Sequence, residues 1–265
     1  MAPPSQPEGD FPWWLLILAV TGGWLFWLVL SDPVYSQALA TLSKGIGITV
    51  FVTVVAFGAA ATLGLGLALA LLSRRRVLRQ AARLYVEVIR GVPIIVLLLY
   101  VAFVLAPALV LLVNLIAGPL GLPEMRTRDF PLLGRAVLAL TIAYSAFIAE
   151  VFRAGLISVE AGQIEAAQSL GLNGWQRFRL VVFPQAFRTI LPPLGNDFVA
   201  MVKDSSLVSV LGVADITQLG KVTAAGNFRY FETYNVVALI YLTMTVGLSL
   251  ALRRFEKRLR ARGGG

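Results

Sequence analysis

The sequence predicts an all-α protein, a bundle of helices that crosses a membrane several times. Hydrophobic residues make up 58% of the 265 positions, only 14% are charged, and the mean hydropathy is +0.80. A soluble domain is about one quarter charged. Several apolar runs are long enough to cross the hydrocarbon core of a bilayer, which takes about 20 helical residues.

The missing residue types exclude most enzyme chemistry. The chain has no Cys and no His, which rules out disulfides, thiolate–metal sites, a Cys nucleophile and the most frequent general base. The net charge is +9, but the basic residues follow apolar runs, which indicates membrane orientation rather than nucleic-acid binding. The two basic clusters are Arg74, Arg75, Arg76, Arg79 and Arg83, and Arg253, Arg254, Lys257, Arg258, Arg260 and Arg262.

The chain begins with a tail and a first membrane helix. Residues 1–12 are polar and Pro-rich, a composition typical of a disordered tail. Residues 13–31 form an apolar run with four Trp residues, which favour membrane interfaces. No Lys or Arg precedes this run and no clear cleavage site is present, so we expect a retained helix rather than a signal peptide.

Two spans follow, at about residues 42–72 and 85–113. In the second, Gly91-Val92-Pro93 is expected to kink or break the helix. In the first span, at about residues 42–72, small residues recur every four positions, which lets helices pack closely in lipid. They are Gly58, Thr62, Gly66 and Ala70, with Ala60, Gly64 and Ala68 beside them.

Three more spans complete the bundle, at about residues 132–157, 191–213 and 236–252. A loop at 117–131 precedes the first of them, and a polar loop around 220–234 precedes the last. The chain ends in a basic tail, 253–265. The positive-inside rule places both basic clusters, and with six spans also the N-terminus, on the cytoplasmic side.

A polar island at residues 158–184 interrupts this apolar pattern on the predicted cytoplasmic side. We expect a helix at 163–170, ended by Gly171 in the left-handed conformation. Asn173 is then placed to cap a second helix at 175–183 that Pro184 closes. The apolar side of this unit fits a hairpin on the lipid surface and a surface for a partner protein equally well.

The island resembles the EAA loop of ABC importer permeases, in the type I group for polar amino acids. The pattern is Glu-Ala-Ala, three residues, Gly, nine residues and an apolar-x-apolar-Pro ending, with Val and Phe here where Ile and Leu are usual. It is filled by Glu165, Ala166, Ala167, Gly171, Val181, Phe183 and Pro184. Further blocks that resemble this subgroup are Ile89–Pro93, Ala149-Glu150, Arg153–Gly155, Gly162-Gln163, Pro184–Ala186, Arg188, Leu191–Asn196 and Lys203–Leu207.

This resemblance implies a five-helix permease core within residues 42–252, with 13–31 as an extra N-terminal helix. The island would be the coupling loop, in which Glu165, Ala166, Ala167 and Gly171 seat in a groove of a cytosolic ATP-binding subunit. The chain has no G-x-x-x-x-G-K-[ST] phosphate loop, so it is not expected to be an enzyme. ATP and magnesium would belong to the ATPase partner, and this chain would need no cofactor or metal.

Candidate substrate contacts lie in the span at 191–213. Asp197 and Asp204 are seven residues apart and therefore share a helix face, on which Met201 falls between them. Carboxylates in a span suit an ammonium group, and Ser205 could bind a carboxylate; the alternative is that the acids pair with Lys203, Arg153 or backbone donors. The resemblance implies acidic substrate contacts in this helix.

Two further pairs, Glu87 with Arg90 and Glu150 with Arg153, are three residues apart and are predicted to form gate or structural ion pairs. Together these observations predict the permease subunit of an importer for polar amino acids in the bacterial inner membrane. It would work with a second permease, two ATP-binding subunits and a periplasmic or extracellular binding protein. An ATP-independent channel or secondary transporter, and an intramembrane enzyme built on the aspartates, are the alternatives.

Overall fold

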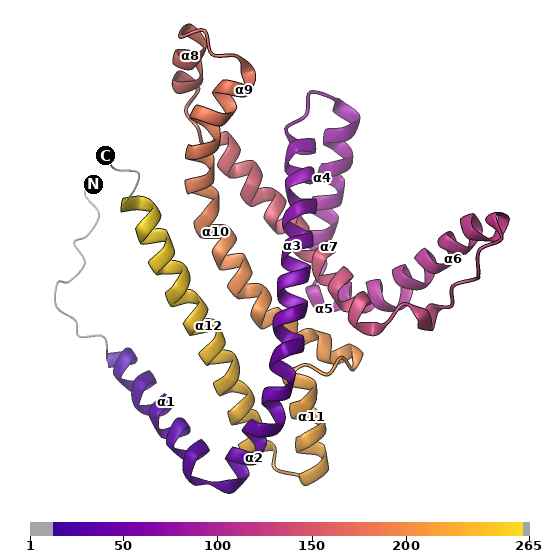
Figure 1. Ribbon diagram of the computed structural model, residues 1–265, viewed down its shortest axis with the longest axis vertical. Coiled ribbons are helices and arrows are strands. Elements are labelled where there is room, and N and C mark those ends of the chain that lie inside the picture. The colour runs from indigo at the N-terminus through magenta and orange to yellow at the C-terminus, as the bar shows by residue number, and fades with distance from the viewer. Residues whose placement is uncertain (1–12, 262–265) are drawn as a thin grey trace.

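The computed structural model describes residues 13–261, and within this range it contains helices and no strand. The predicted disordered tail, 1–12, and the last four residues lie outside the described part. The long helices run roughly side by side, with α8 and α9 at one end and α11 at the other (Figure 1). The end that carries α8 and α9 is called the hairpin end below.

The first helix, α1 (Trp13–Ser31), confirms the predicted helix at 13–31. Asp32 separates it from α2 (Pro33–Leu42), which begins with Pro at its first position and is capped where the Asp32 carboxylate accepts the Val34 amide at 2.7 Å. After a short 3-10 turn (Ser43–Gly45), α3 (Ile46–Leu71) continues in nearly the same direction.

The centre of the bundle is the contact between α3 and α7 (Leu132–Ile157). Ala60, Gly64 and Ala68 are buried along this seam, and a Cβ atom on Gly64 would lie 2.9 Å from the side chain of Ile148 and 3.0 Å from a backbone oxygen of α7. Close packing of small residues is therefore confirmed for this row. The row at Gly58, Thr62 and Gly66 is exposed in this chain, so it does not form the seam between α3 and α7.

The predicted break at Gly91-Val92-Pro93 is confirmed. Gly91 ends α4 (Arg76–Gly91), and Pro93 precedes α5 (Ile94–Tyr100). A five-residue π-helical segment (Val101–Leu105) joins α5 to α6 (Ala106–Ala117), which projects sideways from the bundle (Figure 1). The bounds 85–113 are therefore wrong for a single span, since the long apolar segment is Ile94–Leu120.

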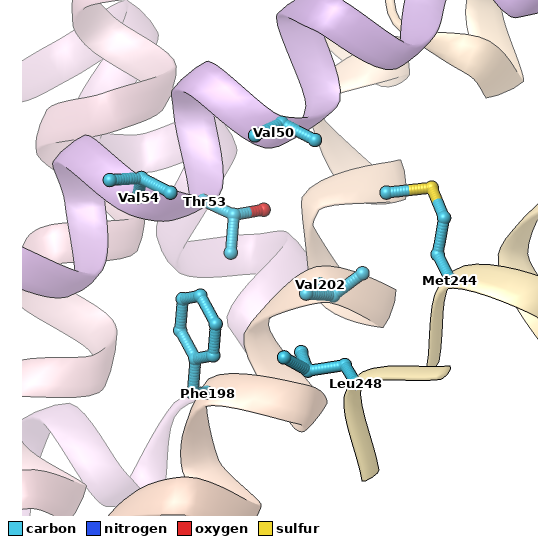
Figure 2. A pocket seen from close by; sticks show the side chains of 7 residues that line it. All are labelled: Val50, Thr53, Val54, Phe198, Val202, Met244 and Leu248. Atoms are coloured by element: carbon cyan, nitrogen blue, oxygen red, sulfur yellow. The ribbon is translucent and has the colours of Figure 1, made fainter. Parts of the chain in front are cut away.

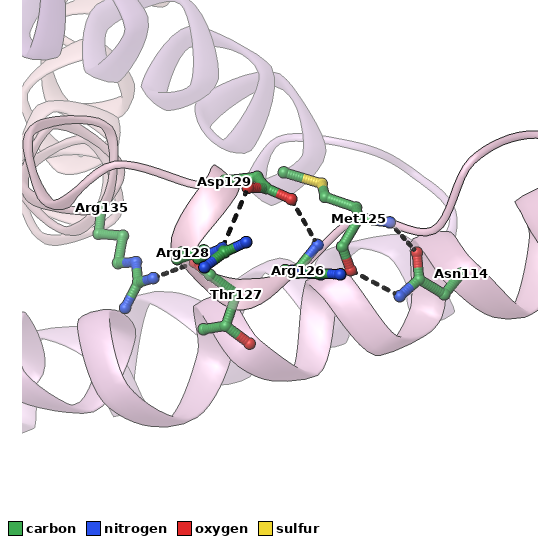
Figure 3. Close-up of polar contacts among 7 residues, drawn as sticks. All are labelled: Asn114, Met125, Arg126, Thr127, Arg128, Asp129 and Arg135. Atoms are coloured by element: carbon green, nitrogen blue, oxygen red, sulfur yellow. Dashed lines mark hydrogen bonds and ion pairs between the residues drawn. The ribbon is translucent and has the colours of Figure 1, made fainter.

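The predicted loop at 117–131 is confirmed, apart from two short 3-10 turns (Gly118–Leu120 and Thr127–Asp129), and polar contacts fix its shape (Figure 3). The Asn114 side chain pairs with both backbone groups of Met125, at 2.8 and 2.9 Å. Arg135 is buried in α7 and donates to the carbonyl oxygens of Ala102, Thr127 and Phe130. This arginine thus ties α7 to both the loop and the preceding π-helical segment.

The predicted end of a helix at Pro184 is wrong. After α8 (Ala161–Ser169), the chain is helical from α9 (Gly174–Arg177) through a π-helical segment (Phe178–Val182) into α10 (Phe183–Asp204), and Pro184 lies in the first turn of α10. A π-helical turn shifts the hydrogen-bond ladder by one residue, which lets a helix continue past a proline that lacks its donor.

The last segments also differ from the predicted loop around 220–234. A 3-10 segment (Ser205–Leu211) leads to α11 (Ile216–Asn227), which occupies most of that region, and α12 (Tyr230–Ala261) follows. The predicted basic tail is therefore helical up to Ala261.

Four described segments are long and apolar enough to cross a membrane: Pro33–Leu71, Ile94–Leu120, Leu132–Ile157 and Tyr230–Arg258. α10, which corresponds to the predicted span at 191–213, is more polar and is not among them. Because it packs against α3, α7 and α12, the other helices cover much of its surface.

Candidate functional site

The two aspartates of α10 lie near a tyrosine of α7. Tyr144 donates its hydroxyl hydrogen to Oδ2 of Asp204 at 2.7 Å, and both Asp197 and Asp204 are near enough to act electrostatically on this hydroxyl. The predicted shared face is therefore confirmed. Tyr144 was not predicted as a site residue, although a polar hydroxyl inside an apolar span could have indicated it.

Asp197 has a carboxylate oxygen, Oδ2, that is buried and has no hydrogen-bond partner in the described part of the chain. Phe198, the next residue, packs edge-to-face on Phe57 of α3, with ring centroids 4.8 Å apart. Buried polar atoms in folded proteins nearly always have partners, and an unpartnered one calls for an explanation such as a ligand. A cationic or ammonium group would supply the missing donor.

The two other predicted substrate contacts differ from expectation. Met201 is fully buried in the main hydrophobic core, so its side chain offers no surface to a ligand in this conformation. Ser205 is also buried and donates to the carbonyl of Val202 at 2.7 Å, the local bonding that serine often shows in membrane helices. The geometry therefore supports Asp197 and Asp204 but not Met201 or Ser205.

The alternative of structural ion pairs for these aspartates is not found among the described residues. The ion pairs there join Arg128 to Asp129 and Arg153 to Glu150. Lys203 is exposed and lies in neither pair. Asp204 is held by the hydroxyl of Tyr144 rather than by a cation.

A cavity of ≈ 240 Å³ lies between α3, α10 and α12 (Figure 2). Thr53 is its one polar lining residue, and its hydroxyl already donates to the carbonyl of Thr49 at 2.8 Å. The cavity therefore has no charged group that could orient a polar ligand. Its lining consists of Val50, Thr53, Val54, Phe198, Val202, Met244 and Leu248.

A second cavity, of ≈ 310 Å³, lies between the last residue of α3, most of the length of α4 and the second half of α7. Its lining includes the four residues of the two predicted ion pairs, of which Glu150–Arg153 is confirmed with Oε2 and Nη2 2.6 Å apart. The pair Glu87–Arg90 is wrong for the described residues, because no ion pair joins them. Instead, the guanidinium of Arg90 lies over the ring of Phe147, 5.7 Å from its centroid.

The hairpin of α8 and α9 has the local structure that its sequence predicts. Gly171 has φ +79, and the amide of Leu172 donates to the carbonyl of Ala167 at 3.2 Å, the bond of a helix-ending Schellman motif. Asn173 then caps α9. Its side-chain oxygen accepts the backbone amide of Gln176 at 2.9 Å, and the side-chain oxygen of Gln176 accepts the backbone amide of Asn173 at 3.0 Å.

The surface of this hairpin is partly apolar. Glu165 and Ala166 are exposed, as predicted for contact residues, but Ala167 is buried and cannot offer its backbone to a partner. Leu170 is 81% exposed and Trp175 is 67% exposed. Exposed large apolar side chains at a loop tip are typical of a protein or membrane contact.

Packing attaches the base of the hairpin to α7. Val159, Ala186 and Ile190 form a small buried cluster at this point. A Cβ atom on Gly155 would lie 2.2 Å from the side chain of Ile190, so only glycine allows α7 and α10 to approach so closely. A displacement of the hairpin would therefore be transmitted to both helices.

Comparison with known proteins assigns the chain to a family. Residues 60–261 match the family described as binding-protein-dependent transport system inner membrane component. The chain belongs to this family. This permease is accordingly a multi-pass protein of the inner membrane.

Similar proteins transport amino acids. The permease is 38% identical to the glutamine transport system permease protein GlnP of Escherichia coli (strain K12), over 69% of this chain and 77% of that protein. It is 36% identical to the probable amino-acid permease protein YxeN of Bacillus subtilis (strain 168), over 84% and 93%.

Solved structures have the same fold. The crystal structure of an amino acid ABC transporter with histidines has 36% identity and a TM-score of 0.71, with 86% of this chain and 97% of that chain covered. The MetNI methionine ABC transporter in inward-facing conformations has 19% identity and a TM-score of 0.65, with 86% and 99% covered. The second likeness supports the fold alone.

Proposed function

We propose that this permease translocates polar amino acids and that Asp197 binds their α-ammonium group. The single observation that carries the assignment of the site is the buried, unpartnered Oδ2 of Asp197. An ammonium group would donate to this oxygen and neutralise the buried charge. Asp204, two turns further along α10, and the hydroxyl of Tyr144 on α7 would bind a second polar group of the same ligand.

Energy for transport comes from separate ATP-binding subunits, because the chain has no phosphate loop. The hairpin would seat in a groove of such a subunit, with Glu165, Ala166 and Gly171 at the contact and Leu170 and Trp175 as its apolar anchors. In this proposal the ATPase binds ATP and magnesium, and the permease has neither cofactor nor metal.

The proposed assembly contains two permeases, either two copies of this chain or this chain with a similar one. The basic residues near the hairpin end, on the α3–α4 turn and on α12, favour a cytoplasmic location for that end and for the C-terminus. A periplasmic or extracellular binding protein would then deliver the amino acid at the opposite end of the molecule, which carries α11. Alternating access would follow from rigid-body rocking of the helices when the ATPase subunits close.

Replacing Asp197 by Asn tests the proposed substrate contact. We expect ATP-driven amino acid uptake by the reconstituted importer to fall at least about tenfold, because a hydrogen bond to a charged group contributes about 1.5–3 kcal/mol. Initial uptake rates at several substrate concentrations would be measured, together with basal ATP hydrolysis. Glu124→Gln removes an exposed carboxylate outside the site and is expected to leave uptake unchanged.

Unchanged uptake by Asp197→Asn would show that this carboxylate does not contact the substrate. Uptake that continues without any ATP-binding subunit would instead favour an ATP-independent channel or secondary transporter. Both results are obtained from the same vesicles, with and without the ATPase.

A further inference from the structure

A third cavity, of ≈ 300 Å³, lies between α2, the end of α11 and the start of α12. These segments are at the end of the molecule opposite the hairpin (Figure 1). Most of the lining is polar, in contrast to the cavity between α3, α10 and α12, and the two apolar members are Val34 and Ala38. The polar members are Gln37, Thr41, Thr223, Asn227, Arg229 and Thr233.

Several polar groups of this lining are not used within the protein. Thr233 is buried, with 1% of its surface exposed, and lines the cavity together with Gln37 and Thr223. The side chains of these three residues donate no hydrogen bond to any group within residues 13–261. Buried polar groups in folded proteins nearly always have a partner. The cavity therefore offers unused donors to an incoming group.

The charge of the lining favours a carboxylate. Arg229 is its one charged residue, and this guanidinium takes part in no ion pair within the part of the chain that the structure describes. The side-chain oxygen of Asn227 accepts the backbone amide of Arg229 at 2.9 Å, which leaves the amide nitrogen of Asn227 as a further donor. Because the lining has a cation and no acid, it suits a carboxylate and not an ammonium group.

The residue between Asn227 and Arg229 indicates where the carboxylate comes from. Phe228 is the one non-glycine residue with a positive φ, +59, among residues 13–261, and it is 82% exposed. A bulky residue rarely adopts this strained conformation, and strained residues often lie at binding sites. An exposed aromatic ring next to an unpaired arginine is typical of the anchors in a protein–protein contact. A free small carboxylate would not need the ring, so the observations favour an acidic side chain of a partner protein.

We propose that the soluble binding protein of the importer docks at this cavity. The carboxylate of one of its Asp or Glu side chains would enter the cavity and accept hydrogen bonds from Arg229 and Thr233, and an apolar part of its surface would cover Phe228. This inference rests on the proposed function, in which the binding protein delivers the amino acid at the end that carries α11. It adds the residues that receive the partner and the chemistry of the contact.

Docking to the assembled importer in lipid nanodiscs tests this proposal. The probe is the soluble binding protein with which the reconstituted importer takes up amino acids, and biolayer interferometry would measure its Kd. We expect Arg229→Gln to raise this Kd at least about tenfold, because it removes a charged hydrogen-bond donor. Thr233→Val has nearly the same shape without the hydroxyl and is expected to raise the Kd severalfold.

Phe228→Gly separates docking from folding. Glycine adopts a positive φ without strain, so the melting temperature of the permease is expected to stay the same or rise. The Kd for the binding protein is nevertheless expected to rise at least about fivefold, because the aromatic anchor is lost. A purely structural role of Phe228 would not produce this combination.

Lys44→Gln is the matched control, since it removes one positive charge from an exposed residue just after α2, outside the lining. It is expected to leave the Kd unchanged. An equal loss in Lys44→Gln and Arg229→Gln would show a general charge effect and overturn the proposal, as would natural affinity in both Arg229→Gln and Thr233→Val. Free glutamate that binds the natural chain but not Arg229→Gln, with docking unchanged, would assign the cavity to a small carboxylate instead.

ATP-driven uptake by the same importer keeps this test apart from that of the proposed function. If uptake occurs and the cavity variants dock normally, the inference about the cavity alone is overturned. If the natural chain neither takes up amino acids nor binds any such protein, the proposed function fails as well.

Discussion

Two aspartates of this permease have buried carboxylate oxygens in different environments. Asp215 is completely buried, and its carboxylate caps α11 through the Gln218 amide at 2.8 Å and accepts the Tyr241 hydroxyl at 3.1 Å. Asp197, in contrast, has a buried oxygen without a partner. The satisfied aspartate fixes helix positions, whereas the unsatisfied one is available to a ligand.

Asp215 predicts a pH dependence of stability. Burial raises the pKa of the Asp215 carboxyl, and the hydrogen bonds from Gln218, Thr217 and Tyr241 oppose this only in part. A raised pKa means that the folded chain favours the protonated form, so this stabilising contribution is present at low pH. It is lost as the pH rises beyond the ordinary aspartate value of about 3.9 and through the raised pKa.

We therefore expect Asp215→Asn to be insensitive to this titration. Thermal unfolding in detergent from pH 4 to pH 8 would compare the variant with the natural chain. The variant is expected to gain relative stability as the pH rises, because Asn keeps the cap without the buried charge. A difference in midpoint that stays constant over this range would contradict the assignment.

The tight surroundings of Gly45 predict that any larger residue at this position would disturb the local packing. A Cβ atom there would lie 2.5 Å from the backbone nitrogen of Ile216 and 2.6 Å from the carbonyl carbon of Asp215, so backbone must move. We expect Gly45→Ala to destabilise the permease by about 1–3 kcal/mol. Gly47→Ala has open space around the new methyl group and is expected to keep or slightly raise the melting temperature. Equal melting temperatures for the two variants would contradict this prediction.

At the scale of elements, α10 joins the hairpin to the candidate site. The helical run from Gly174 to Asp204 passes through a π-helical segment and reaches both Asp197 and the buried cluster at the base of the hairpin. Because packed helices move as rigid bodies and the base of the hairpin packs on both α7 and α10, a shift of the hairpin would move both helices and with them the aspartates and Tyr144. In the proposed function, this connection would couple a bound ATPase to the candidate substrate site.

Gly171→Arg tests this coupling. The change places a bulky cation on the tip of the hairpin, at a position with φ +79, where a side chain costs about 1–2 kcal/mol. We expect uptake to fall at least severalfold while ATP hydrolysis continues and the permease stays in the membrane.

Gly121→Arg is the matched control for this variant. Gly121 has φ +69 and open space around it, and it lies in the loop that joins α6 to α7. The backbone strain is therefore similar, but α6, which leads into this loop, projects away from the hairpin (Figure 1). An equal loss of coupling in both variants would indicate strain rather than a lost contact with the ATPase.

At the scale of the whole molecule, the core is formed by α3, α7 and α10. The extra helix α1 lies outside this core and packs on α2 and α12. Its exposed aromatic residues, Trp13, Trp24 and Trp27, favour the membrane interfaces. The hairpin and α11 lie at opposite ends, so a protein bound at one end cannot contact a protein bound at the other.

The lack of Cys makes this orientation directly testable. Ser169→Cys on α8 and Asn227→Cys at the end of α11 would each introduce the single thiol of the chain, at an exposed position. In intact cells, a membrane-impermeant thiol reagent is expected to label Asn227→Cys but not Ser169→Cys. Labelling of Ser169→Cys without cell lysis would reverse the proposed topology.

The sequence by itself determined the features that depend on local chemistry or on spacing along one helix. These include the all-α membrane class, the break at Gly91–Pro93, the Gly171 and Asn173 caps, the Glu150–Arg153 pair and the shared face of Asp197 and Asp204. Each rests on groups within one or two helical turns, so the helix period fixes their relation. The family was identified differently, from the resemblance of the EAA pattern and its flanking blocks to those of ABC importer permeases.

The tertiary structure decided everything that depends on which helices meet. It selected Ala60, Gly64 and Ala68 as the packing row, buried Met201 and Ala167, left Glu87 without Arg90, and brought Tyr144 to Asp204 across 60 positions of sequence. It also carried the helix past Pro184 through a π-helical turn. Periodicity shows that a helix has faces, but only the packing of the neighbouring helices determines which face meets protein, lipid or ligand.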